Sequence, residues 1–248
     1  MIHSFLLMGQ SNMAGRGRLN EAKEIDKSHI RIMRNGRWQP MFRPINPDRS
    51  FSGVNLAESF AEKYAEKYGV DVGLIPCADG GTTLEQWKEG SILFENAVNL
   101  ARLAQRTSRI VGILWHQGES DCPDDRYPLY REKFEAMLSA FRRETGLSDV
   151  PVIVGALGDF LPDCTSQPCG NYHYINEFLR QIADADPLVG LATAEGLGHN
   201  GDNLHFNAEA LYEFGLRYFA EYERIGAPAD KSDGELEDDS KRSSMEAL

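Results

Sequence analysis

A serine at the end of an apolar run could act as a nucleophile. The run "FLLM" stops before Gly9, and Ser11 follows within "GQSN". A strand-to-helix turn here would let the hydroxyl project above a sheet, where a base could take its proton. The residues around it do not complete G-x-S-x-G, and neither of the common glycine-rich phosphate loops is present. The alternative interpretation is that Ser11 caps the following turn.

The stretch "GDNLHFN" could supply the base and a carboxylate to orient it. Asp202 precedes His205 by three residues, a spacing at which two side chains can share one face of a turn. The carboxylate would then fix the imidazole tautomer while the other ring nitrogen faces Ser11. A capping or packing role before the last helix is the alternative for His205. His199 has no carboxylate at this spacing, and His116, which ends a hydrophobic run, is interpreted as structural.

Acyl transfer also needs hydrogen-bond donors for the oxyanion that forms during attack. We expect these donors to be the backbone N–H of Ser11, a glycine N–H from "DGGTT" and the side-chain amide of Gln117. A residue without Cβ lets the backbone approach the reacting atoms closely, and Gly81 is favoured over Gly80. The alternatives are a tight turn for the glycines and a plain surface-loop position for Gln117.

Strand-like and helix-like segments alternate along the chain. Near-continuous apolar strands alternating with helices indicate a parallel sheet covered on both faces. We therefore predict a three-layer, doubly wound, flavodoxin-like α/β fold with about five parallel strands. The predicted strands are 4–8, 70–77, 109–117, 150–157 and 188–195, and the predicted helices are 55–69, 94–105, 129–146, 172–185 and 207–224. Residues 16–54 fit this pattern badly, and 29–42 is expected to form a small hairpin that turns at Asn35-Gly36.

Four loops rich in small and polar residues follow predicted strands. In an open α/β sheet, sites form outside the carboxyl ends of the strands, which meet at one edge. The loops are 9–12, 78–83, 116–121 and 196–207. Their convergence would unite the candidate nucleophile, base and oxyanion donors in a single site.

Composition limits the classes of partner. The chain has 248 residues, 42% of them hydrophobic, and a formal net charge of -12. An acidic balance without a Lys/Arg-rich block argues against nucleic acid and anionic membranes as partners. We expect one domain over 1–226 and an acidic, disordered tail over 227–248. The oligomeric state is left open.

Targeting and redox signals are weak. No segment reaches the roughly 18 apolar residues of a membrane span, and the N-terminus lacks the features of a signal peptide. The sequence as it stands therefore predicts a cytoplasmic protein, with secretion as the alternative for a mature form. Cys164 and Cys169 could form a local disulfide in an oxidising compartment, and free thiols are the alternative.

Four blocks in this order resemble the SGNH/GDSL hydrolase superfamily, and most closely its branch of carbohydrate acetyl esterases, such as acetylxylan esterase and sialate O-acetylesterase-like proteins. The blocks are "GQSNM", "DGGTTLEQW", "WHQGESD" and "GDNLHF". The resemblance implies a serine esterase without metal or cofactor. By position it makes Ser11 the nucleophile, Asp202 and His205 the rest of the triad, and Ser11, Gly81 and Gln117 the oxyanion hole. "GQSN" departs from the better-known "GDS", and Gln117 stands where most of the superfamily has Asn.

Other residues of these blocks have two interpretations each. Glu119 could hydrogen-bond to the loop of Gln117 or hold the triad histidine, and a structural role is favoured. Gln10 and Asn12 could fix the nucleophile's loop or touch a sugar hydroxyl. Trp87 could be a stacking platform for a sugar, although a buried packing role is more usual for tryptophan.

The leading hypothesis is a serine esterase that removes O-acetyl groups from a carbohydrate such as acetylated xylan or sialic acid, through an acyl-enzyme. One alternative is a catalytically silent carbohydrate-binding protein on the same fold. Another is a metal-dependent hydrolase, although no paired ligand motif supports it. Its potential ligands would be Asp79, Asp121, His116, His199 and His205.

Overall fold

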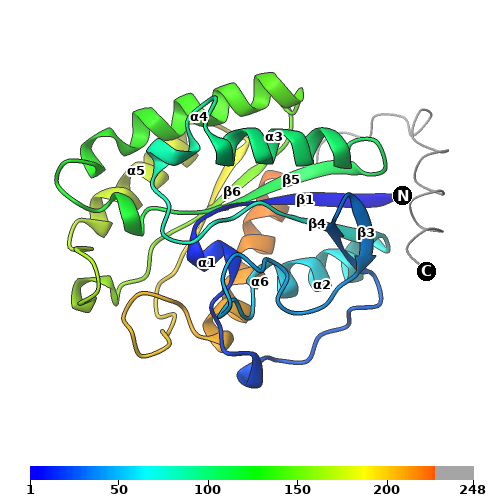
Figure 1. Cartoon of the computed structure of the whole chain (residues 1–248), viewed down its shortest axis with the longest axis horizontal. Coiled ribbons are helices and arrows are strands. Elements are labelled where there is room, and N and C mark those ends of the chain that lie inside the picture. The colour runs from blue at the N-terminus through cyan, green and yellow to red at the C-terminus, as the bar shows by residue number, and fades with distance from the viewer. Residues whose placement is uncertain (227–248) are drawn as a thin grey trace.

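Seven strands form one sheet in the computed structural model, which describes residues 1–226 (Figure 1). The strands of the β2–β3 pair are antiparallel, and all other neighbours are parallel. The predicted flavodoxin-like α/β class is confirmed, with a wider sheet than the about five strands expected. In spatial order the strands are β3 (Arg37–Pro40), β2 (Ile30–Arg34), β4 (Asp71–Pro76), β1 (Ile2–Gly9), β5 (Arg109–His116), β6 (Val152–Gly155) and β7 (Val189–Ala192).

The two additional strands are the predicted hairpin, which joins the sheet at its edge. It turns at Asn35-Gly36 as predicted, and β2 pairs with β4 from Ile30 to Ile32. Both isoleucines are fully buried, and Gly73 of β4 leaves the space that the ring of Trp38 occupies. Apolar burial on one face of the hairpin therefore attaches it to the sheet.

Helices cover both faces of the sheet, as Figure 1 shows. α3, α4 and α5 lie on one face, and α2 and α6 lie on the other. The helices predicted over 55–69 and 129–146 end where expected, because Gly69 and Gly146 each adopt the left-handed conformation that terminates a helix. The helices are α1 (Ser11–Ala14), α2 (Ala57–Tyr68), α3 (Ile92–Ala104), α4 (Tyr130–Thr145), α5 (Tyr172–Ala185) and α6 (Ala208–Ile225).

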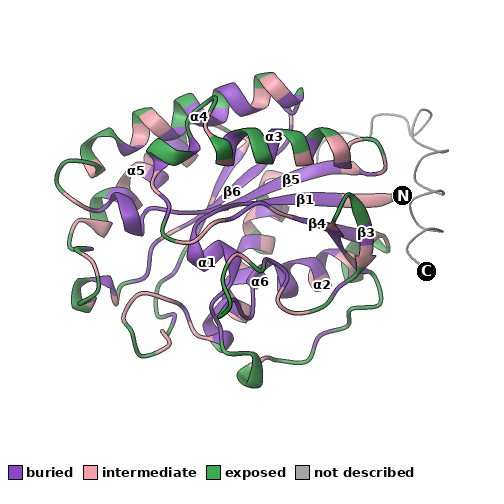
Figure 2. Ribbon diagram, viewed as in Figure 1, coloured by how far each residue is buried: buried purple, intermediate pink, exposed green. Residues whose placement is uncertain are grey.

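The core has one apolar layer on each side of the sheet (Figure 2). β1 lies in the middle and alternates between the layers, with Leu6 and Met8 on the α3–α4–α5 side and Phe5 and Leu7 on the other. All four side chains are at most 1% exposed, which explains why this strand reads as a continuous apolar run.

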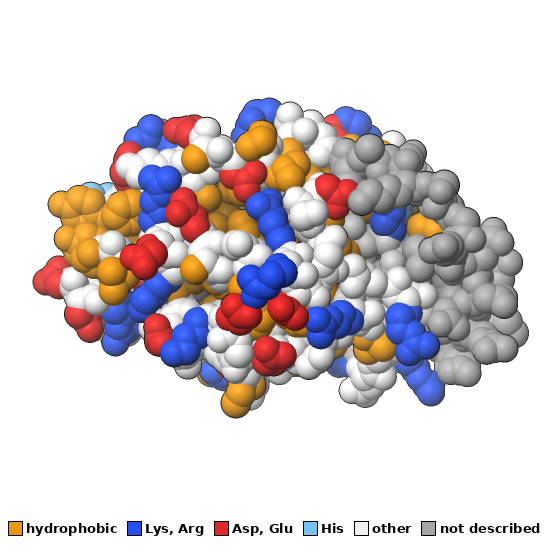
Figure 3. Space-filling view, turned by 90° about the horizontal axis from the view of Figure 1, so that it is seen from above, with side chains coloured by type: hydrophobic (Ala, Val, Ile, Leu, Met, Phe, Trp, Pro, Cys, Tyr) orange, Lys and Arg blue, Asp and Glu red, His pale blue; other side chains and the backbone are white. Residues whose placement is uncertain are grey.

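The outer surface of α3 and α4 carries interspersed charges of both signs (Figure 3). Arg102 pairs with Glu144 and Arg143 pairs with Glu89 on this face. No helix within residues 1–226 is both long and apolar enough for a membrane crossing. The acidic tail expected at 227–248 lies outside the described residues.

Candidate active site

The candidate nucleophile sits on the turn between β1 and α1. Gly9 has a φ of +132°, and a Cβ there would lie 2.1 Å from the carbonyl oxygen of His116, so only glycine fits between the two strands. The next N–H, of Gln10, donates to that carbonyl over 2.9 Å. Ser11 then begins α1 at the carboxyl edge of the sheet, at the point where the strand order reverses direction.

The structure brings Ser11, His205 and Asp202 together. His205 Nε2 lies 3.0 Å from Ser11 Oγ, and His205 Nδ1 lies 2.7 Å from Asp202 Oδ2. The Ser11 residue is 6% exposed, whereas the carboxylate side chain of Asp202 is 45% exposed. The arrangement is a hydrogen-bonded relay from a carboxylate through an imidazole to a hydroxyl, which is suited to general-base activation of the serine.

Asp202 is held as a carboxylate by its own loop. Its Oδ1 accepts hydrogen bonds from the backbone N–H groups of Leu204 (3.0 Å) and His205 (2.9 Å). Partial burial acts to raise the pKa of Asp202, but these bonds and the imidazole of His205 outweigh it and hold the pKa below its usual range. The charged form therefore persists to lower pH than in an ordinary aspartate.

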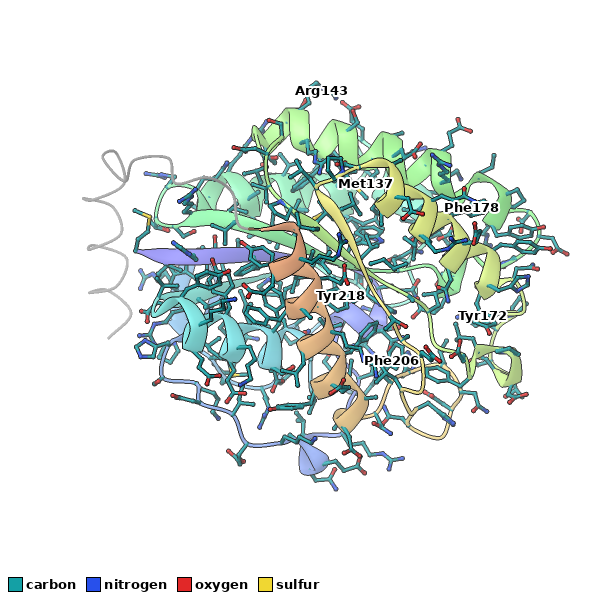
Figure 4. All side chains as sticks on the ribbon, turned by 180° about the vertical axis from the view of Figure 1, so that it is seen from behind. Met137, Arg143, Tyr172, Phe178, Phe206 and Tyr218 are labelled. Carbon is teal, nitrogen blue, oxygen red and sulfur yellow. The ribbon has the colours of Figure 1, made fainter. Side chains whose placement is uncertain are left out.

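Asn12 connects the nucleophile turn to the histidine loop. Its Nδ2 donates to the carbonyl of Leu204 (3.1 Å), and its Oδ1 accepts from the N–H of Phe206 (3.1 Å). Figure 4 labels Phe206 on the loop that leads into α6. Asn12 is 1% exposed, so of its two predicted roles the structure supports loop fixing rather than contact with a sugar.

A buried carboxylate lies behind Asn12. Glu119 Oε1 accepts from Asn12 Nδ2 over 2.5 Å and lies 3.2 Å from His116 Nε2. Burial acts to raise the pKa of Glu119, but the charge and hydrogen bond of His116 and the bond from Asn12 lower it below the usual range. Of its two predicted roles, Glu119 therefore takes the structural one, with a bond to His116 in the loop of Gln117, and it reaches the loop of His205 through Asn12.

The glycine loop lies beside the nucleophile. A Cβ at Gly80 would be 3.4 Å from Ser11 Cβ, and the Gly80 N–H donates to Asp48 Oδ2 over 2.9 Å. Gly81 has a positive φ of 78°, with open space where a Cβ would stand. Within residues 1–226 the N–H groups of Gly81 and Ser11 have no hydrogen-bond acceptor, so both remain available as donors. The choice of Gly81 over Gly80 stays a prediction that this geometry favours.

Gln117 does not present a free amide to the nucleophile. Its Nε2 donates to the carbonyl of Thr82 over 3.0 Å and to Asp121 Oδ2. Asp121 Oδ2 also accepts from the N–H of Leu84 over 2.9 Å, and burial raises the pKa of Asp121. Because both acceptors are oxygens, the amide is fixed with its nitrogen toward them. In this structure Gln117 and Asp121 support the glycine loop, and the expected third oxyanion donor is occupied elsewhere.

Sequence reasoning missed a support on the other side of the glycine loop. Asp48 accepts two bonds from Arg16, of 2.9 and 2.7 Å, in addition to the one from Gly80. Arg49 donates to Asp79 Oδ1 (2.7 Å) and to the carbonyl of Gly80 (2.9 Å). Arg16, Asp48 and Arg49 lie in the segment 16–54, which fits the strand–helix pattern badly. Only their charge, which is common on any protein surface, could have drawn attention to them.

Two further predictions concern residues that turn out to be structural. Gln10 Oε1 accepts from the N–H groups of Gly118 (3.4 Å) and Ser120 (3.3 Å) and is buried, so it fixes the loop after β5. Trp87 is fully buried and donates to Thr82 Oγ1, so the interpretation as a sugar platform is wrong and the packing alternative holds.

The remaining histidines support neighbouring loops. His116 is fully buried against the rings of Phe206 and Phe214, in agreement with a structural role. His199 Nδ1 accepts from the N–H groups of Gly201 (3.1 Å) and Asn203 (3.2 Å) and shapes the loop before His205.

Neither a metal cluster nor a disulfide is built from the described chain. Within residues 1–226 no three His, Cys, Asp or Glu side chains form a group that could hold a metal ion. Two of the potential metal ligands have other partners, since the carboxylate of Asp79 accepts a hydrogen bond from Arg49 and that of Asp121 accepts one from Gln117. Cys164 and Cys169 are free thiols, as are the other two cysteines, so the disulfide alternative is not realised.

A mostly parallel α/β sheet with these four blocks at its carboxyl edge, together with a family match over nearly the whole described chain, places the protein in the class of SGNH-like hydrolases. The chain belongs to the family described as "SASA: Carbohydrate esterase, sialic acid-specific acetylesterase", whose sequence profile matches residues 1–224. The resemblance inferred from the motifs is thereby confirmed.

Similar proteins agree with this membership. The chain is 29% identical over 236 residues to "Probable carbohydrate esterase At4g34215" of Arabidopsis thaliana, with 86% of each chain covered. The crystal structure of that plant protein superposes with a TM-score of 0.78 at 28% identity, over 90% of this chain and 98% of the other. A carbohydrate acetylesterase from Xanthomonas citri shares the fold, with a TM-score of 0.67 at 19% identity, over 90% of this chain and 56% of the other.

Proposed function

We propose that the protein is a serine esterase that removes O-acetyl groups from carbohydrates, with acetylated xylan and acetylated sialic acid as candidate substrates. The observation that carries the proposal is the relay in which Ser11 Oγ lies 3.0 Å from His205 Nε2 and His205 Nδ1 lies 2.7 Å from Asp202. Membership of a carbohydrate esterase family supports the substrate class.

The reaction follows from the positions of these groups. His205 Nε2 takes the proton of Ser11, and the serine oxygen attacks the ester carbonyl. The oxyanion accepts hydrogen bonds from the free N–H groups of Ser11 and Gly81. Protonated His205 then gives its proton to the departing sugar alcohol. A water molecule, deprotonated by the same imidazole, attacks the acyl-enzyme and releases acetate.

Asp202 has two tasks in this scheme. It accepts from Nδ1–H of His205, which fixes the tautomer that leaves Nε2 free to act as base. Its negative charge also stabilises the imidazolium that forms in each half-reaction. The lowered pKa of Asp202 keeps that charge in place.

The nucleophile assignment is tested with Ser11→Ala and 4-nitrophenyl acetate. We expect turnover to be lost while the thermal midpoint changes little, because the substitution removes one small hydroxyl. Labelling by a fluorophosphonate probe, mapped by mass spectrometry, should modify Ser11 in the wild-type protein. A silent carbohydrate-binding protein would give no label at this position, and retained turnover in Ser11→Ala would remove the serine from the mechanism.

A further inference from the structure

We propose that Phe51 is a stacking platform for the sugar of the substrate, and that this sugar is a neutral one. The inference rests on the proposed function and specifies its substrate class. Phe51 is 67% exposed. An exposed aromatic ring near a site that handles sugars can cover the apolar face of a pyranose ring.

The location of Phe51 connects it to the nucleophile. The ring centroid lies 5.3 Å from Cζ of Arg16. A Cβ at Gly80 would lie 2.4 Å from Arg16 Nη2 and 3.4 Å from Ser11 Cβ. Arg16 and Gly80 therefore connect the exposed ring of Phe51 to Ser11 through a series of neighbouring groups. In this proposal, a sugar whose acetyl group reaches Ser11 extends toward the ring of Phe51.

The segment that carries Phe51 is held in place. Ser52 Oγ donates to Asp48 Oδ1 over 2.7 Å and accepts from the N–H of Arg49 over 3.0 Å. The N–H of Gly53 donates to the carbonyl of Gly15, just after α1. The aromatic ring is thus displayed by a hydrogen-bonded turn, so little conformational entropy is lost when a ligand covers it.

The charges beside the ring indicate a neutral ligand. Arg16 is bound through both terminal nitrogens by Asp48, and the two side chains are 4% and 5% exposed. Arg49 is paired with Asp79 at 2.7 Å. The positive charges of the two arginines are balanced by the negative charges of the two aspartates. A sugar carboxylate bound here would therefore find no unpaired cation to bind. It would also experience the negative charge of Asp202.

The first experiment compares three acetyl esters on the wild type and Phe51→Ala. The esters are an acetylated xylo-oligosaccharide, O-acetylated sialic acid and 4-nitrophenyl acetate. We expect higher kcat/KM for the neutral sugar than for the sialic acid. Phe51→Ala should raise KM for the neutral sugar about tenfold, which corresponds to roughly 1.4 kcal/mol of lost binding. It should leave 4-nitrophenyl acetate within about twofold, because that ester has no sugar ring to stack.

Two variants serve as controls. Phe51→Trp keeps an aromatic face and should retain the low KM, whereas Ile92→Ala, at an 86% exposed position on α3, should change nothing. A KM for the neutral sugar that is unaffected in Phe51→Ala would overturn the platform, as would an equal loss on all three esters. Wild-type hydrolysis of 4-nitrophenyl acetate without release of acetate from either sugar would instead contradict the proposed function.

The charge argument has its own test. Asp79→Asn removes the carboxylate that pairs with Arg49, so the guanidinium keeps its bonds to the carbonyls of Asp48 and Gly80 but loses the counter-charge of Asp79 and can attract a carboxylate. Because Asp79 also helps to hold the glycine loop, the readout is the ratio of kcat/KM for O-acetylated sialic acid to kcat/KM for the neutral sugar, and we expect this ratio to rise severalfold. A wild-type preference for sialic acid, or no gain in Asp79→Asn, would overturn the assignment to neutral sugars.

Discussion

The side chain of Asn12 hydrogen-bonds to the peptide groups on both sides of His205, through the carbonyl of Leu204 and the N–H of Phe206. Asn12 is also the residue directly after Ser11. One short turn therefore carries the hydroxyl and fixes the loop of its base, although the two loops are separated by nearly the whole folded chain. We therefore expect the 3.0 Å contact between Ser11 and His205 to depend on Asn12.

Asn12→Ala should lower kcat without removing the reacting groups. Small displacements of a catalytic base can cost about 10²-fold in rate, and we expect a loss of that order, with KM for 4-nitrophenyl acetate within about threefold. Steady-state kinetics measure both constants. Asn96→Ala, at an exposed position on α3, is the matched control. An unchanged kcat in Asn12→Ala would show that the histidine loop holds its place without Asn12.

Asp202→Asn should reduce kcat far more than stability. The backbone N–H groups of Leu204 and His205 would hold the amide oxygen of the asparagine, so its NH2 group would face Nδ1 of His205 as a donor. The imidazole would then lose both its tautomer and its counter-charge. In serine hydrolases of this geometry the corresponding change costs about 10⁴-fold in kcat, and we expect 10³- to 10⁴-fold here. Because Asp202 is half exposed, the thermal midpoint should shift little. A loss below tenfold would argue that another group orients His205.

Asp121→Ala tests the support of the glycine loop. The substitution leaves the amide of Gln117 and the N–H of Leu84 without their shared acceptor, so Gly81 should lose its fixed position. Removing one oxyanion donor costs about 10²- to 10³-fold, and loosening one should lower kcat by at least about tenfold. Asp125→Ala, at a 77% exposed side chain, should have no effect. Equal activities of these two variants would contradict a supporting role for Asp121.

Glu119→Gln should destabilise the protein in a pH-dependent manner. The pKa of Glu119 is lower in the folded than in the unfolded chain, so its contribution is complete above the unfolded value of about 4.3. That contribution is lost as the pH falls through the lower folded pKa. At neutral pH we expect the free energy of unfolding to drop by about 1–3 kcal/mol, because the buried pair with His116 is broken.

Urea unfolding of wild type and Glu119→Gln between pH 7 and pH 3 would measure this effect. The difference between the two proteins should shrink as the pH is lowered below about 4.3. Glu209→Gln, at an 83% exposed side chain, should follow the wild type at every pH. A difference that stays constant with pH would mean that Glu119 contributes by packing alone.

The sequence by itself was sufficient for the class of fold and for the three candidate side chains that the structure brings together, those of Ser11, Asp202 and His205. The five predicted strands and five predicted helices all occur, because each one buries an apolar face that is visible in local periodicity. Asp202 and His205 are close in sequence, so their contact is local. The motif "GQSN" marks a strand that ends in a glycine, and strand ends meet at one edge of a parallel sheet.

Tertiary structure alone decided how those side chains are supported. Asn12 is bonded to Glu119 and to the carbonyl of Leu204, and Gln117 is bonded to the carbonyl of Thr82, so these bonds join loops that are distant in sequence. Polar side chains show no periodicity from which their partners could be predicted. The same limit applies to Asp48 and Phe51, which occupy an irregular segment where no apolar repeat exists. Buried apolar residues recur at regular spacing along the chain, so the elements that they form can be predicted from the sequence. A hydrogen bond between two loops forms only after the backbone has folded and brought its donor and acceptor together.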